Sequence, residues 1–159
     1  SGFQSYQFRE LKFILGVKSM KRFNNLPDGG TEQRQLKMRY QQPTLWDSFL
    51  RYIANKAYNV PQYLLNRDVT QPLEPSQDVQ DILIEIYHND LPITQVCEGL
   101  IDLDELIQEW RYRHVQIVRR TLGGKLGTGG STGVEYLMQA VCSPVFPDLW
   151  AIRTQLSYR

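Results

Sequence analysis

The 159-residue sequence predicts an all-α protein, a helical bundle, on three observations. Apolar residues recur every three or four positions along most of the chain, which is the period of an amphipathic helix. The alternation of apolar and polar residues that is typical of strands is weak throughout. The longest helical pattern runs from about Pro92 to Leu122. A chain of this length is expected to form a single domain over residues 1–159.

The charge balance limits the classes of function. Lys plus Arg number 18 and Asp plus Glu number 17, so the formal net charge is +1. This argues against a non-specific DNA coat or a polybasic membrane anchor, and no nucleic acid or membrane partner is expected. No apolar run approaches the ~20 residues of a membrane helix. Cys97 and Cys142 stand 45 residues apart outside any CxxC pattern, which indicates reduced, structural thiols and a cytoplasmic location.

The first part of the chain predicts two helices separated by a polar stretch. Residues 3–15 have helical spacing, and Gly16 is a plausible helix terminus. Residues 19–42 are polar and contain the turn sequence Asp28-Gly29-Gly30, with a short helix expected near 31–40.

Two further helices are expected before the longest one. Pro43-Thr44 opens a helix through about Ala57, with Leu45, Phe49, Tyr52 and Ile53 on one face. Prolines then mark a connecting stretch. Residues 76–88 form the next amphipathic helix, whose apolar positions are Val79, Ile82, Leu83, Ile86 and Tyr87.

The long helix carries the most informative pattern. Its apolar positions, with one histidine among them, are spaced alternately by three and four residues: Leu100, Leu103, Ile107, Trp110, His114, Ile117 and Thr121. This spacing predicts that His114 lies on the buried stripe of the helix. Asp102, Asp104 and Glu105 precede the basic residues of the same helix, an order that suits the helix dipole.

Two interpretations of His114 remain open on these grounds. A single histidine on an apolar helix face is most often a core residue. Alternatively, Trp110 and Tyr112 could wall a flat pocket, and Arg111, Arg113, Arg119 and Arg120 could neutralise carboxylates. Such a helical pocket suits a haem held by one axial imidazole. His88, the only other histidine, fits a cation at a helix C-terminus, so sites with two or three His ligands are excluded unless carboxylates contribute.

A glycine-rich segment follows the long helix at residues 123–133. It is not a Walker A loop, because no Gly-Lys-Ser/Thr closes it, and it is not a Rossmann fingerprint, because a helix precedes it. It is either a plain connector or a loop whose backbone N–H and hydroxyl groups approach a ligand, with Thr128 and Lys125 as candidate contacts. Helical spacing returns over 134–141, and Phe146 begins a last short helix.

Three stretches together resemble one family, the tryptophan 2,3-dioxygenases. Residues 1–9, SGFQSYQFR, are similar to the family segment SGFQSxQFR. Residues 110–114, WRYRH, and 127–133, GTGGSTG, are similar to its pair WRxRH and GTGGSSG. Residues 146–150, FPDLW, followed by Arg153-Thr154, are similar to its terminal FPELWxxRT. The order and spacing of the three agree over nearly the whole chain.

The resemblance implies a helical bundle of the haem-dependent indole dioxygenase type, with a Gly-rich substrate loop. It implies haem b with its iron as cofactor, L-tryptophan and O2 as substrates, and usual assembly as a homo-oligomer, a tetramer. The implied reaction inserts both atoms of O2 across the indole C2–C3 bond and gives N-formylkynurenine, the first step of the kynurenine pathway.

The resemblance also assigns roles to residues of this chain. His114 would be the proximal ligand of the haem iron. The other haem contacts would be Phe8, Arg9 and Trp110. The substrate contacts would be Thr128, at the tryptophan ammonium, with Gly129 in the same loop, and Ser1 and Gly2 beside the indole on the distal side. No residue of this chain is assigned as a catalytic acid or base.

The family pattern also contains a segment that precedes the SGFQS motif. That segment supplies a distal histidine, an aromatic wall and an arginine that clamps the substrate carboxylate, and no position of this chain matches them. The chain is therefore expected to be about half of a larger catalytic domain, its C-terminal portion. It is one piece of a nicked or split enzyme with a complementary N-terminal chain, a truncation, or a short relative that binds haem without turnover. The same residues are compatible with a related indole oxygenase that has another substrate, and with an all-α interaction protein in which His114 merely packs.

Overall fold

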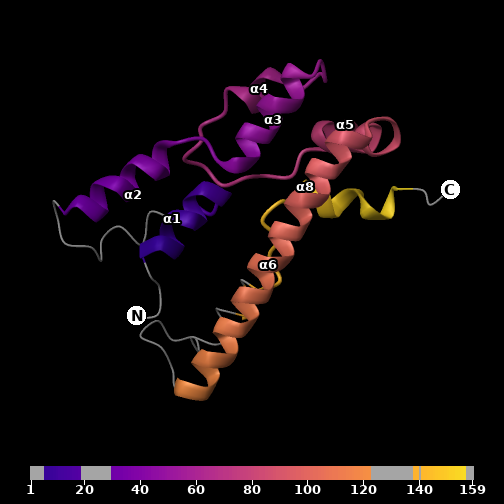
Figure 1. Ribbon diagram of the computed structural model, residues 1–159. Helices are drawn as coiled ribbons and strands as arrows, with labels where there is room; N and C mark the ends of the chain where they lie inside the picture. The colour runs from indigo at the N-terminus through magenta and orange to yellow at the C-terminus, as the bar shows by residue number, and fades with distance from the viewer. Residues whose placement is uncertain (1–5, 19–29, 123–137, 140, 157–159) are drawn as a thin grey trace. The chain divides into compact units, whose positions relative to one another are not determined.

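The computed structural model describes residues 6–18, 30–122, 138–139 and 141–156, and within these residues every regular element is a helix (Figure 1). This confirms the predicted all-α class. The elements in order are α1 Tyr6–Leu15, α2 Thr31–Gln41, α3 Leu45–Asn55, α4 Gln62–Leu65, α5 Gln77–Asn89, α6 Leu91–Leu122, α8 Pro147–Ala151 and the 3₁₀ turn η2 Ile152–Thr154. None of the described helices is both long and apolar enough to cross a membrane. The chain divides into two compact units, Ser1–Ile82 and Leu83–Arg159, and the prediction of one domain over 1–159 stays a prediction.

In the first unit, α1 and α2 pack through a small aromatic and aliphatic cluster. Phe13 and Leu36 are buried, and Tyr40 packs against them with its ring edge-to-face to Phe13, the centroids 5.5 Å apart. α2 is otherwise polar, so this contact supplies the burial that holds it as a helix. Gly16 ends α1 as expected, with a φ of +97°. A Cβ atom on residue 16 would lie only 2.7 Å from Cδ1 of Leu73, so the packing of Leu73 also requires glycine at this position.

The N-terminus of α3 is fixed by a capping box. The Thr44 hydroxyl accepts a hydrogen bond from the Asp47 N–H, and the Asp47 carboxylate accepts one from the Thr44 N–H at 2.8 Å. The buried face of α3 differs from the prediction. Phe49 and Ile53 are buried as expected, but Tyr52 is exposed. Trp46 is buried on this face instead, and its ring stacks on that of Phe49 with the centroids 5.0 Å apart.

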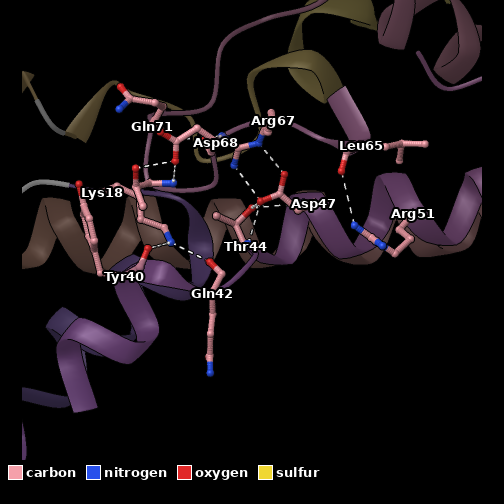
Figure 2. A network of polar contacts seen from close by, with 11 residues as sticks. Lys18, Tyr40, Gln42, Thr44, Asp47, Arg51, Leu65, Arg67, Asp68 and Gln71 are labelled. Carbon is pink, nitrogen blue, oxygen red and sulfur yellow. Dashed lines mark hydrogen bonds and ion pairs between the residues drawn. The ribbon is translucent and has the colours of Figure 1, made fainter. Parts of the chain in front are cut away.

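Figure 2 shows how one arginine extends this cap into the following loop. Arg67 donates to both carboxylate oxygens of Asp47, at 2.5 Å from Nε and 2.8 Å from Nη2. Its Nη1 donates to the carbonyls of Asp68 and Gln71. The pair is largely buried and bidentate, which is the geometry in which an ion pair is strong.

Lys18 caps the C-terminal end of α2 in the same unit. Its ammonium donates to the carbonyls of Tyr40 at 2.6 Å and Gln42 at 2.8 Å, and more weakly to that of Arg39 (Figure 2). These carbonyls are at the negative end of the α2 dipole. Burial lowers the pKa of Lys18 to about 8, against the opposing influence of the Asp47 charge.

Acid is expected to destabilise the wild type more than the Asp47→Asn variant. Burial alone would raise the pKa of Asp47, but hydrogen bonds from Arg67 and Thr44 outweigh it and hold the pKa below the ordinary 3.8. The carboxylate therefore contributes its full stabilisation above about pH 4, and this contribution is lost as the pH falls through the lower, folded-state pKa. Urea unfolding midpoints at a series of pH values between 7 and 2 measure the difference. Parallel acid limbs for the two proteins would contradict the assignment.

The second unit is built around the long helix α6. Asp90 begins it: its carboxylate accepts a hydrogen bond from the Ile93 N–H, and its carbonyl accepts one from the Thr94 N–H at 2.9 Å. Ile93, Cys97 and Ile101 on α6 are buried, as are Leu83 and Ile86 on α5. A tight αα turn at Asp90 therefore joins two helices that each bury apolar residues, and the Thr94 hydroxyl donates to the Ile86 carbonyl across the turn at 3.1 Å.

The C-terminal segment is attached to α6 by a buried carboxylate. Asp104 is 0% exposed and accepts hydrogen bonds from the N–H groups of Val145 and Phe146, at 2.8–3.0 Å. It also accepts from the indole N–H of Trp150 at 2.9 Å and from Gln108 at 2.9 Å. Four donors thus converge on one carboxylate, and Phe146, Leu149 and Ile152 are fully buried in the same unit.

A second polar contact holds the chain near its end. Arg153 donates to Glu98 at 3.0 Å and to the Tyr87 hydroxyl at 2.9 Å, and that hydroxyl donates to Glu98 at 2.8 Å. Burial is the main reason that the pKa of Tyr87 is raised, and the hydrogen bond to Glu98 adds to it. Tyr87 therefore stays a neutral donor, and η2, α5 and α6 are joined through it.

Candidate functional site

The rotation of α6 about its axis decides which side chains are available for binding. Its most buried positions follow the helical period: Ile93, Cys97, Ile101, Asp104, Ile107, Val115 and Val118. Val115 and Val118 are 1% and 4% exposed, so the C-terminal half of the helix is anchored by one face. Arg111 reinforces this anchor, because its Nη1 donates to the Ser143 carbonyl at 2.7 Å.

The prediction that His114 lies on the buried stripe is wrong. His114 is half-buried, whereas its seam neighbours Trp110 and Ile117 are 39% and 54% exposed. Alternating spacings of three and four average 3.5 residues, but a straight α-helix has 3.6 per turn, so such a seam drifts by about 20° per heptad. Leu100 and Ile107 at the start of the seam are buried, and its end has rotated outward.

The imidazole of His114 stacks on the indole of Trp110. The ring centroids are 4.9 Å apart and the planes are only 10° from parallel. The residues are four apart on the helix, so the contact follows directly from the sequence spacing. The result is an accessible imidazole on a partly apolar surface formed by Trp110, His114 and Ile117.

The arginines near this surface divide into two kinds. Arg111 is engaged with Ser143, and burial lowers its pKa although the charge of Asp104 opposes the shift. Arg113 pairs with Glu109 at 2.6 Å on the exposed side of the helix. Arg119 and Arg120 are exposed in the last turn of α6. The last two are therefore better placed than Arg111 to meet an anionic group at the C-terminal end of the helix.

These residues fit a haem better than a metal ion held by protein ligands alone. No group of three or more His, Cys, Asp or Glu side chains that could hold a metal ion occurs among the described residues. A haem needs only one protein ligand on its proximal side, and His114 offers an accessible imidazole. The flat indole of Trp110 and the exposed Ile117 supply apolar surface of the kind that a porphyrin face covers. The side chains on this face of α6 are therefore compatible with a haem held by a single histidine.

The remaining predicted site residues are not assembled with His114 in the described part of the chain. Ser1, Gly2, Thr128 and Gly129 lie outside the described residues, and for Phe8 only the α1 backbone is described. Arg9, also on α1, belongs to the other compact unit. Its Nε is buried and has no hydrogen-bond partner. A buried guanidinium nitrogen of this kind is costly unless an acceptor is supplied, which is compatible with an anionic ligand.

The cysteines take no part in the described site. Cys97 is fully buried, as expected, and burial raises its pKa to about 12, so it remains an unreactive thiol. Cys142 is exposed, which corrects the expectation that both cysteines pack internally. His88 is exposed in the last turn of α5, at the helix C-terminus where the sequence placed it.

Sequence reasoning missed the anchoring role of Asp104. It grouped this residue with the acidic side chains that suit the helix dipole, whereas the structure buries it among Ile101 and Ile107. Its register was the available signal, because Asp104 follows Cys97 and Ile101 at the spacing of the buried face. A charged residue at a core position indicates a buried network.

Comparison with known proteins gives consistent results. The sequence profile of a family described as tryptophan 2,3-dioxygenase matches residues 79–156. The tryptophan 2,3-dioxygenase of Herpetosiphon aurantiacus is 51% identical over 159 residues, which cover 98% of this chain and 59% of that protein. Those of Anaeromyxobacter sp. (strain K) and Bacillus thuringiensis subsp. konkukian are 44% and 35% identical over 98% of this chain, and it covers 58% and 57% of them. The chain thus spans somewhat more than half the length of these relatives.

Proposed function

We infer from these matches that the chain belongs to the tryptophan 2,3-dioxygenase family, and we propose that it forms the haem-binding part of a haem b-dependent enzyme that converts L-tryptophan and O2 to N-formylkynurenine. One observation carries the proposal. His114 in the WRYRH motif is the histidine that the family resemblance assigns to the iron, and it presents an accessible imidazole on α6.

A bound haem would supply the iron that activates O2 for insertion into the indole. His114 would hold the iron through an imidazole nitrogen. Its place is fixed by the rotation of α6, which the buried Val115 and Val118 and the contact of Arg111 with Ser143 set on the adjacent face of the helix. Arg119 and Arg120, exposed in the last turn of α6, would neutralise the haem propionates. For Arg9 the haem contact rests on the family resemblance, and its unsatisfied Nε is a donor that an anionic group could accept from.

The substrate contacts in this proposal come from the N-terminal motif and from the glycine-rich segment at residues 123–133. The Thr128 hydroxyl accepts a hydrogen bond from the tryptophan ammonium, and the glycine loop with Gly129 lets the backbone approach the amino-acid moiety closely. Ser1 and Gly2 border the indole, and Phe8 contacts the haem edge. In this proposal, the residues that bind the tryptophan carboxylate and contact the indole nitrogen come from elsewhere in the enzyme. The proposed enzyme assembles as a homo-oligomer, a tetramer, or with a complementary N-terminal chain. Its proposed location is the cytoplasm.

The test is titration of the haem-loaded protein containing this chain with L-tryptophan, followed by product analysis under O2. We expect the Soret band to shift on binding and a product heavier than tryptophan by two oxygen atoms to form. Indole-3-propionate, which lacks the ammonium, is the control ligand. Thr128→Ala is expected to weaken the binding of L-tryptophan but not that of indole-3-propionate. A bound haem with no tryptophan product would favour a haem-binding module without turnover. Absence of a haem band would contradict the proposal.

A further inference from the structure

The contact between Trp110 and His114 restrains the imidazole more tightly than packing on an aliphatic side chain would. Side chains on an α-helix lean toward its N-terminus, so His114 leans over the residue one turn before it, which is Trp110, rather than over Ile117. The rings are nearly parallel, at 10°, with centroids 4.9 Å apart. Rotation of the imidazole about its Cβ–Cγ bond would break this face-to-face contact. The indole therefore holds the ring in one orientation and covers one of its faces.

The position of the Trp110 indole is itself fixed by the packing of α6. On the adjacent face of α6, Val115 and Val118 are buried, and Arg111 donates to the Ser143 carbonyl at 2.7 Å. These contacts fix the rotation of the helix, so the position of the Trp110 backbone is set. Trp110 itself is 39% exposed, so a larger part of its surface is covered than is open to solvent. The orientation of the pair is thus tied to the fold of the second unit.

We propose that Trp110 is a positioning residue: it sets the plane of the His114 imidazole about the axis of its bond to the haem iron, and it slows loss of that ligand. This rests on the proposed haem-binding function. Residues beside a ligating histidine commonly fix its ring through a hydrogen bond to the second ring nitrogen. In this chain a stacked indole on the same helix face adds a constraint of a different kind. The plane of an axial imidazole governs its overlap with the iron orbitals, so its orientation has a spectroscopic signature that activity alone does not report.

Two variants of Trp110 and one control test the proposal. Trp110→Leu removes the aromatic plane, and Trp110→Phe keeps a smaller one. Leu106→Ala is the matched control, because Leu106 is an exposed apolar residue, 62% exposed, on the same helix one turn before Trp110. Each protein is loaded with haem, its ferric form is complexed with cyanide, and the rhombicity of the EPR spectrum is recorded. Transfer of haem to an excess of apomyoglobin gives the rate of haem loss.

We expect Trp110→Leu to change the EPR rhombicity and to accelerate haem loss by roughly three- to tenfold, the range that corresponds to one aromatic stacking contact. Trp110→Phe should fall between Trp110→Leu and the wild type, and Leu106→Ala should match the wild type in both measurements. If Trp110→Leu fails to fold by circular dichroism, Trp110→Phe decides the question. Unchanged rhombicity and rate in the folded Trp110 variants, with haem bound, would overturn only this inference. A wild type that binds no haem would overturn the proposed function as well.

Discussion

His114→Ala is expected to abolish the Soret band and tryptophan turnover while leaving the helical content unchanged. Changing residues that merely orient a metal ligand typically lowers metal affinity by about 10- to 100-fold, and loss of the ligand itself exceeds that. The His114 side chain is half-buried, whereas Val115 and Val118 are almost fully buried, so the helix is expected to stay anchored through these valines when His114 is removed. The measurements are the absorption spectrum after haem reconstitution, the rate of product formation, and far-UV circular dichroism.

The second histidine provides the control for this experiment. His88 is exposed at the end of α5, and His88→Ala should retain both the Soret band and turnover. His114→Gly adds a rescue, because exogenous imidazole can enter the space that the side chain leaves and restore the band. A normal Soret band in His114→Ala would mean that His114 is not the axial ligand and only packs against Trp110.

Asp104→Ala is expected to destabilise the protein by about 3–5 kcal/mol, a large fraction of the stability of an ordinary domain. The carboxylate is 0% exposed and accepts hydrogen bonds from two backbone N–H groups, the Trp150 indole and Gln108. Alanine would leave these donors without an acceptor inside the core. Asp104→Asn keeps the shape but turns one oxygen into a donor, so about 2 kcal/mol is expected. Urea unfolding followed by circular dichroism measures both.

A neighbouring acidic residue separates burial from charge. Asp102 is on the same helix but exposed, and Asp102→Ala should change the free energy of unfolding by no more than about 0.5 kcal/mol. Comparable losses in Asp102→Ala and Asp104→Ala would show that the hydrogen bonds to Asp104 do not anchor the C-terminal segment. Asp104→Ala is also expected to weaken haem binding, because that segment includes Ser143, whose carbonyl holds Arg111 and with it the rotation of α6.

The sequence alone determined the longer helices, because their signals are local, whereas the short α4 at Gln62–Leu65 falls in a stretch that was predicted only as a connection. Periodicity and caps placed α3 after Thr44, ended α1 at Gly16, and located a short helix near 31–40 that the structure has at Thr31–Gln41. The motifs at both ends of the chain and around His114 were sufficient to indicate the family, since those residues follow one another closely along the chain.

Tertiary structure alone decided which faces of those helices are covered. A row of apolar residues along a helix does not reveal which element packs against it. Over several turns of α6, the 3.5-residue period of this row also drifts away from the buried face, so Trp110 and Ile117 are exposed. The same dependence on distant partners hid Asp104, whose donors at Val145 and Phe146 are 41 and 42 residues away in the chain, and Lys18, whose acceptor carbonyls close α2. Local sequence specifies a helix, whereas its rotation and its buried polar groups are set by non-local contacts.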